Sequence, residues 1–256
     1  MFNQPATDDQ RSLWQKIGQM GTAPTWNLGK VTITLVCAFF AFIIGSIIVL
    51  TWAENQPFAT LAGWSLGAVL TIFFISRYFG MSNETAGLQM QPPAMSAFFI
   101  MFIAIGFAFG ADLLALAVTG EFLPSPELAS VNLNGFSGVE GFFMIVFMIF
   151  LQPVAEELVF RGVAFPVLRQ KLRPYLGILV TAVLYGAFHF LVYPPNMNSI
   201  NAITPIWYGF VTPMLAGIVI GMFRSATGST RAAIYAHIAF GLFAVLKVVT
   251  IMGGLG

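Results

Sequence analysis

Seven ionisable residues lie inside long apolar stretches of this chain, where charged side chains are rare and costly and therefore mark functional candidates. The set is Asp112, Glu156, Glu157, Arg161, His189, His237 and Lys247. Both histidines of the protein belong to it. Carboxylates and imidazoles are among the side chains that most often transfer protons in catalysis. Their presence in apolar segments favours proton-transfer chemistry in a buried site.

The stretch 152–162 holds two adjacent glutamates and one arginine. On an α-helix, Glu157 and Arg161 are four residues apart and share a face, so we expect them to form an ion pair. Glu156 points about 140° away from Arg161 by the same helical geometry, which leaves its carboxylate free for chemistry. Gln152 lies one helical turn before Glu156 and would donate a hydrogen bond to it.

The spacing of the two histidines predicts where they lie relative to this helix. Glu156 and His189 are nearly equidistant from an expected turn at 172–173, so an antiparallel helix pair places them at similar depth. His237 lies only about two helical turns beyond Arg231, which places it nearer the cytoplasmic end. A tilted last helix, or a fourth helix that projects beyond the membrane, would bring His237 to the same level.

The remaining candidates have weaker support. Asp112 has no matching base in the sequence, which disfavours a proton relay, and we expect Lys247 to extend its ammonium outward to the interface. Two pairs of glycines have the four-residue spacing of close helix packing, Gly106 with Gly110 and Gly217 with Gly221. We expect all four glycines to lie at helix contacts.

Three short motifs in the second half of the chain match one family. Glu-Glu-x-x-x-Arg occupies 156–161, Tyr-x-x-x-His occupies 185–189, and His-x-x-x-Gly occupies 237–241. The set resembles the CPBP (Abi) family of intramembrane proteases, which includes type II CAAX prenyl endopeptidases and bacteriocin-processing or immunity proteins. The family usually has Phe where this chain has Tyr185, and Asn or Asp where it has Gly241. The resemblance covers about 138–250.

The resemblance implies a mechanism and a set of site residues. Glu156 would act as general base on a water, assisted by His189, and His237 would stabilise the oxyanion. The family shares this last role with the residue replaced by Gly241, and losing one oxyanion donor costs about 10²–10³ in rate. The implied catalytic residues are Glu156, His189, His237, Glu157 and Arg161.

A second interpretation assigns the same side chains to a metal. Glu156, His189 and His237 would be three protein ligands of a divalent ion such as zinc, with water in the fourth position and Glu157 as the base. We favour the mechanism without a cofactor, because Glu156 has no adjacent histidine on its own helix of the His-Glu-x-x-His kind.

Composition and apolar blocks predict the elements that position these residues. Of the 256 residues, 58% are hydrophobic and 8% charged, whereas soluble domains have roughly a quarter charged. A net charge of +1 gives no basic field for nucleic acid, and the single Cys37 excludes an internal disulfide. A membrane span needs about 20 apolar residues. We therefore predict an all-α, polytopic transmembrane bundle of about seven spans, at 31–53, 58–78, 94–119, 142–168, 175–193, 205–223 and 231–251.

Two features of the predicted spans bear on the site. The fourth is interrupted by Pro153, Gly162 and Pro166, so we expect it to break into a span and a short interfacial helix. Lysines and arginines occur at alternate ends of the spans, and the loops 120–141 and 194–204 contain none. This pattern predicts a protein of the cell membrane with a cytoplasmic N-terminus and an external C-terminus.

The chain divides into three predicted parts. Residues 1–30 form a cytoplasmic segment with an amphipathic interfacial helix around Trp14, and they lack the apolar core of a signal peptide. Residues 31–137 form accessory transmembrane helices, and 138–256 form the core that carries the site.

Three functions remain in competition. The first is an intramembrane endopeptidase that opens toward the cytoplasmic half of the bundle. It would act on a membrane peptide or a prenylated C-terminus, within membrane lipid. The second is a non-catalytic relative that acts by binding, as an immunity or assembly factor, which Gly241 would explain. The third is a small transporter, which the absence of internal repeats disfavours.

Overall fold

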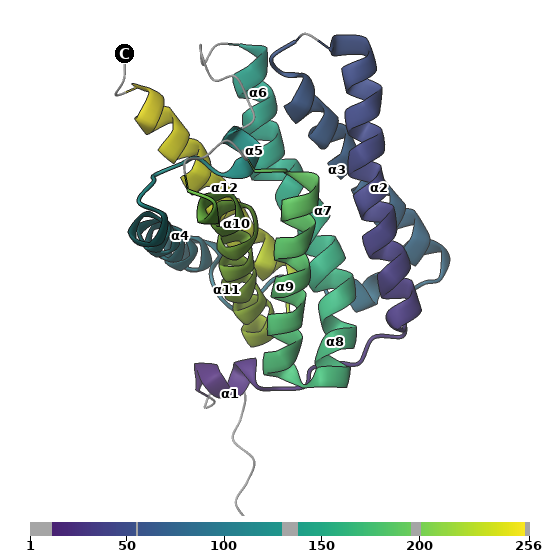
Figure 1. Ribbon diagram of the computed structural model, residues 1–256. Coiled ribbons are helices and arrows are strands. Elements are labelled where there is room, and N and C mark those ends of the chain that lie inside the picture. Colours follow the sequence, from purple (N-terminus) through teal and green to yellow (C-terminus); the bar gives the residue numbers. More distant parts are fainter. Residues whose placement is uncertain (1–11, 55, 130–137, 196–200, 254–256) are drawn as a thin grey trace, which may run out of the picture.

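The computed structural model describes residues 12–54, 56–129, 138–195 and 201–253. This part of the chain contains helices and no strands (Figure 1). Seven helical segments in it are long and apolar enough to cross a membrane. The predicted all-α bundle of a multi-pass membrane protein is therefore confirmed. The spans are α2 (Leu28–Ala53), α3 (Ala59–Met81), α4 (Ala97–Thr119), the composite Val139–Leu172, α9 (Pro174–Val192), the composite Ile203–Thr227 and α12 (Thr230–Gly253).

Contrary to expectation, the fourth span does not break. It runs continuously through α6 (Val139–Ile145), η3 (Val146–Leu151), α7 (Gln152–Glu157), η4 (Leu158–Ala164) and α8 (Phe165–Leu172). The segments η3 and η4 are π-helical, and each ends two residues before a proline, Pro153 or Pro166. Proline lacks an amide hydrogen and its ring crowds the carbonyl one turn earlier, and a wider π turn accommodates both effects without ending the helix.

The same arrangement recurs in the sixth span. It consists of α10 (Ile203–Ile206), the π-helical η5 (Trp207–Val211) and α11 (Thr212–Thr227). Here Pro213 follows the π turn by two residues. All three π turns therefore have one local cause in the sequence. Because such turns often occur at functional sites, the two that flank α7 direct attention to that short helix.

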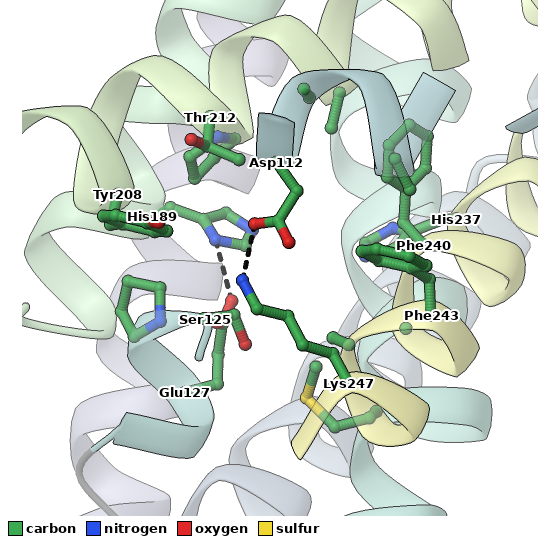
Figure 2. Close-up of a pocket in the computed structure, with 18 of the residues that line it drawn as sticks. Asp112, Ser125, Glu127, His189, Tyr208, Thr212, His237, Phe240, Phe243 and Lys247 are labelled. Carbon is green, nitrogen blue, oxygen red and sulfur yellow. Dashed lines mark hydrogen bonds and ion pairs between the residues drawn. The ribbon is translucent and has the colours of Figure 1, made fainter. Parts of the chain in front are cut away.

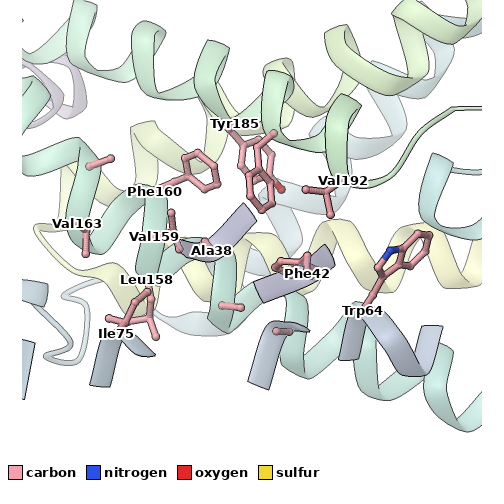
Figure 3. Close-up of a cluster of buried hydrophobic side chains, with 14 of the residues drawn as sticks. Ala38, Phe42, Trp64, Ile75, Leu158, Val159, Phe160, Val163, Tyr185 and Val192 are labelled. Atoms are coloured by element: carbon pink, nitrogen blue, oxygen red, sulfur yellow. The ribbon is translucent and has the colours of Figure 1, made fainter. Parts of the chain in front are cut away.

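The first two spans contribute to the core rather than only surrounding it. A continuous cluster of buried side chains joins α2 and α3 to η4 and α9, and Figure 3 shows Phe42 on the opposite side of this cluster from Phe160 and Tyr185. The ring of Trp64 also meets that of Tyr193 edge-on, with centroids 5.0 Å apart. The predicted accessory helices thus help to position side chains close to the candidate site.

The N-terminal segment and a loop support the start of α12. The short α1 (Leu13–Ile17) packs against α11, where the Ser225 hydroxyl donates to the Ile17 carbonyl over 2.7 Å. Thr230 donates from its amide to Gln89 and from its hydroxyl to Leu88, beside the 3₁₀ helix η2 (Thr85–Leu88). In Figure 1 the turn between α8 and α9 reaches lower than the start of α12. The fourth and fifth spans therefore extend past α12, which is one of the two arrangements that would bring His237 level with His189.

The two glycine pairs have different outcomes. A Cβ atom on Gly217 would lie 3.2 Å from Ala182, and one on Gly221 would lie 3.1 Å from Ile178, so this pair packs against α9 as predicted. Gly106 and Gly110 have nothing within 4 Å of an added Cβ. The predicted packing role of Gly106 and Gly110 is therefore wrong. Both line an apolar groove between α4, α11 and α1.

Candidate active site

Glu156, on α7, lies at the centre of a buried polar cluster. Its side chain is fully buried (0% exposed), and Oε2 lies 2.9 Å from Nε2 of His189. Its Oε1 accepts hydrogen bonds from the Tyr193 hydroxyl at 2.7 Å and from Nε2 of Gln152 at 3.3 Å. The expected proximity of Glu156 and His189 is present, and so is the hydrogen bond from Gln152. Tyr193 is an additional partner, one helical turn after His189 on the same face.

Glu157 links three helices through a second buried cluster. Its Oε1 accepts from Nη1 of Arg161 at 2.9 Å and lies 2.9 Å from Nδ1 of His237. Nη2 of Arg161 donates to the Gly217 carbonyl at 2.7 Å. The predicted ion pair is therefore present. Because both charged partners are fully buried, it fixes α12 and α11 against the π-helical part of the fourth span.

His237 joins the two clusters. Its Nε2 lies 3.9 Å from Oε2 of Glu156 and 3.3 Å from the Tyr185 hydroxyl. A neutral imidazole has one N–H donor, and the carboxylate of Glu157 requires that hydrogen on Nδ1. Nε2 then accepts the hydroxyl hydrogen of Tyr185. In this state the donor beside the cavity is the Tyr185 hydroxyl, and His237 donates through Nε2 only when it is protonated.

Glu127, which no sequence motif placed near the histidines, completes the site. It lies on the short helix α5 (Pro126–Ala129), and its buried Oε1 is 3.0 Å from Nδ1 of His189 and 3.2 Å from Nε2 of Gln152 (Figure 2). Burial favours the neutral acid, but the hydrogen bond and charge of His189 outweigh burial and hold the pKa of Glu127 below its usual value. The one local signal was Ser-Pro-Glu at 125–127, which is typical of a helix start.

Gly241 occupies a helix contact and leaves no room for a side chain. A Cβ atom at this position would lie 2.2 Å from the carbonyl oxygen of Met148, on η3. The backbones of α12 and η3 therefore touch where the family motif has an asparagine or an aspartate. An amide or acid at position 241 does not fit this packing, so Gly241 is part of how α12 approaches the fourth span.

We expect the Gly241→Ala variant to be less stable than the wild type, by about 1–3 kcal/mol or more, because overpacking at a backbone contact forces the helices apart. Thermal unfolding of the detergent-solubilised protein would show a lower midpoint. The matched control is Gly110→Ala, on the open face of α4, which should keep the midpoint or raise it, because alanine is the better helix former. Equal midpoints for Gly241→Ala and the wild type would contradict the contact.

A cavity of about 110 Å³ adjoins the imidazoles. Tyr185, His189 and His237 line it, and so do Asp112 and Lys247. The segment that carries α5 also lines it, through Ser125 and Glu127. The opening toward the cytoplasmic half stays a prediction.

Asp112 and Lys247 also differ from expectation. Lys247 does not extend outward, because its side chain is buried and its ammonium lies 2.5 Å from Oδ1 of Asp112. Asp112 thus has a basic partner, from a helix 135 positions later in the sequence. The five implied catalytic residues lie together, and this pair lines the same cavity as the two histidines.

The side chains provide a poor fit to the zinc alternative. Among the described residues, no group of three or more His, Cys, Asp and Glu side chains has the geometry of a metal site. Nδ1 of each histidine faces a glutamate, Glu127 or Glu157, and Nε2 of His189 is at hydrogen-bonding distance from Glu156. The arrangement is that of a hydrogen-bonded network.

Comparison with known proteins supports the family assignment. The model of the family described as type II CAAX prenyl endopeptidase Rce1-like matches residues 138–243. No curated protein and no solved structure matches the chain. The matched segment carries all three motifs and most of the buried carboxylate–imidazole cluster. Residues 138–243 are therefore similar to the type II CAAX prenyl endopeptidase Rce1-like family, which is consistent with the CPBP resemblance of the sequence.

Proposed function

We propose that the protein is an intramembrane endopeptidase in which Glu156 activates the hydrolytic water. The observation that carries the proposal is the convergence of Glu156, His189 and His237 from three different spans, with the two histidines lining one cavity. Buried ionisable groups in a membrane bundle are expensive and mark sites of function. Their contacts with one another provide a base and a proton carrier next to a space that a peptide can enter.

The first chemical step is a proton transfer from water. Glu156 and His189 together take the proton, and the remaining hydroxide forms a bond to the carbonyl carbon of the substrate. The contacts of His189 with carboxylates on both nitrogens provide a place for this proton, since an imidazolium donates through both. When the carbon–nitrogen bond breaks, the same proton passes to the leaving amine.

The second requirement is a donor for the oxyanion. Tyr185 lines the cavity, and its hydroxyl lies beside Nε2 of His237. When a carbonyl oxygen becomes negatively charged, this hydroxyl can turn from the imidazole to the oxyanion. His237 adds a second donor when it is protonated. We therefore assign the oxyanion to Tyr185 together with His237, at a site where Gly241 offers no side chain.

Glu127 is a positioning residue in this mechanism, because it acts through His189. A carboxylate at Nδ1 fixes the ring orientation and keeps Nε2 directed at Glu156. The Glu127→Gln variant should lower kcat by about 10- to 100-fold, as for other partners that orient a functional histidine, and leave KM unchanged. Added formate or acetate should partly restore kcat in Glu127→Ala. Glu140→Gln, outside the cavity, is the control.

The substrate proposed is a lipid-anchored peptide, as the family implies. The apolar groove between α4 and α11 has a volume of about 910 Å³. It shares Ala111, Ala216 and Phe240 with the catalytic cavity, so the two spaces adjoin. An isoprenoid chain would lie in the groove while the attached peptide enters the cavity.

The test is cleavage of a farnesylated fluorogenic CAAX peptide by the purified protein in proteoliposomes. The proposal expects cleavage that requires both the lipid and His189. The alternative, a non-catalytic relative that acts by binding, has one observation in its favour, the lack of space for a third-motif side chain at Gly241. It would gain support if the wild type bound the peptide without cleaving it.

A further inference from the structure

The pair of Asp112 and Lys247 lines the same cavity as His189 and His237. The ammonium of Lys247 donates to Oδ1 of Asp112 at 2.5 Å and to the Leu123 carbonyl at 2.6 Å, and it lies 3.9 Å from the centre of the Phe122 ring. Two hydrogen bonds and the rings of Phe122 and Tyr208 surround this cation. Lys247 therefore serves to hold the Asp112 carboxylate in place beside the cavity.

The second oxygen of Asp112 has no such partner. Asp112 is only 6% exposed, and Oδ2 makes no hydrogen bond within the described part of the chain. In Figure 2 the carboxylate projects into the space between His189 and Lys247. An unpaired buried carboxylate oxygen is costly, and here it lines a cavity that leads to the active site. This oxygen of Asp112 can therefore accept a hydrogen bond from a bound ligand.

Two hydroxyls extend this unpaired polar surface. Ser125 and Thr212 line the same cavity, and their hydroxyl oxygens also lack hydrogen bonds among the described residues. A hydroxyl can donate to a carbonyl and accept from an N–H. Together with the open oxygen of Asp112, these hydroxyls offer hydrogen-bond donors and acceptors along the cavity. They match the alternating N–H and carbonyl groups of a peptide main chain. A hydrocarbon chain in this space would leave all of them unsatisfied.

The cavity that Asp112 lines is also lined by His189 and His237, so a peptide bound for cleavage can reach this carboxylate. We propose that Asp112, held by Lys247, accepts a hydrogen bond from a main-chain N–H of the substrate. This inference rests on the proposed endopeptidase function and adds a subsite to it.

The charges around Asp112 favour a neutral N–H over other ligands. A free amino terminus would meet the adjacent ammonium of Lys247, and a free carboxylate would meet the charge of Asp112 itself. Two of the three hydrogen-bond donors of Lys247 are directed at Asp112 and Leu123. A main-chain amide carries no net charge and needs only the open acceptor. The subsite therefore binds an internal part of the peptide.

An N-methylation scan of the substrate tests this on the wild-type protein. Farnesylated fluorogenic peptides would each carry one N-methyl group, at successive positions along the peptide. One position should raise KM by about 10-fold or more, the effect of losing a hydrogen bond to a charged group, with kcat unchanged. Uniform tolerance of N-methylation along the peptide would overturn the subsite.

Protein variants assign the effect to Asp112. Asp112→Asn should raise KM for the unmethylated peptide and abolish the sensitivity to N-methylation. Asp112→Asn leaves Lys247 as an unpaired buried cation. The double variant Asp112→Asn with Lys247→Met removes that cation, and it should show the same higher KM and the same loss of sensitivity to N-methylation. The control is Glu84→Gln, which breaks the ion pair of Glu84 with Lys30 away from the cavity.

The outcomes separate this inference from the function on which it rests. Sensitivity that persists in both Asp112 variants would place the contact elsewhere and overturn the assignment. Complete absence of cleavage by the wild type would instead count against the endopeptidase proposal. Cleavage that ignores both the N-methyl groups and Asp112 would leave the endopeptidase intact and remove only the subsite.

Discussion

Replacing Glu156 with glutamine is expected to lower kcat for peptide cleavage by about 10²- to 10⁴-fold, the usual contribution of a general base. The amide has nearly the shape of the carboxylate, and its oxygen can still accept the hydrogen bond from Tyr193. It cannot take a proton from water at neutral pH. The loss should therefore appear in kcat, while KM for the farnesylated peptide stays close to the wild-type value. Stopped-time cleavage in proteoliposomes would measure both constants.

Two controls make the Glu156→Gln result specific. Thermal unfolding should show a folded protein, and Glu140→Gln, outside the catalytic cavity, should keep full activity. A Glu156→Gln protein that cleaves at the wild-type rate would exclude the proposed base. Treatment with EDTA addresses the zinc alternative separately, because loss of activity that zinc restores would favour a metal held by Glu156 and the two histidines.

The part of the site that the sequence predicts depends on local helical geometry. The pairing of Glu157 with Arg161 needs only the four-residue repeat. The proximity of Glu156 to His189 needs that repeat and one short turn, because equal distances from the turn give equal depth. The seven spans follow from apolar length alone. In each case, neighbouring parts of the chain fix the result.

The part that could not be predicted depends on contacts between distant segments. Glu127 reaches His189 because a loop folds back into the bundle, and no repeat or motif encodes that path. Asp112 and Lys247 meet across 135 positions, so each looked unpaired when considered on its own helix. The level of His237 depends on how far α8 and α9 extend past the start of α12, which the lengths of the apolar blocks do not show.

The glycines show the same limit within one motif. Gly106 with Gly110 and Gly217 with Gly221 have identical spacing, yet only the second pair lies against another helix. Spacing identifies a face that permits close approach, and the neighbouring helix decides whether the approach occurs. Gly241 is the reverse case. Its motif position suggested a lost functional group, whereas the structure shows a backbone contact with Met148.

Removing the Tyr185 hydroxyl in a Tyr185→Phe variant is expected to lower kcat by about 10²–10³-fold, the usual cost of losing an oxyanion donor. The phenyl ring keeps the packing against Phe160 and His189, so KM and the thermal midpoint should stay close to wild type. The control is Tyr208→Phe, which removes a cavity-lining hydroxyl that donates to the Glu121 carbonyl instead. Equal kcat for Tyr185→Phe and wild type would assign the oxyanion elsewhere.

The oxyanion role of Tyr185 connects the two positions, 185 and 241, at which this chain differs from the family motifs. Position 241 has no space for a donor, because α12 rests on the Met148 carbonyl there. Position 185, where the family has a phenylalanine, carries a hydroxyl directed at His237 and lines the cavity. A donor absent from α12 is thus present on α9, next to the same imidazole. If the two departures are coupled in this way, Gly241→Asn should fail to rescue Tyr185→Phe, because the asparagine has no room to enter the site.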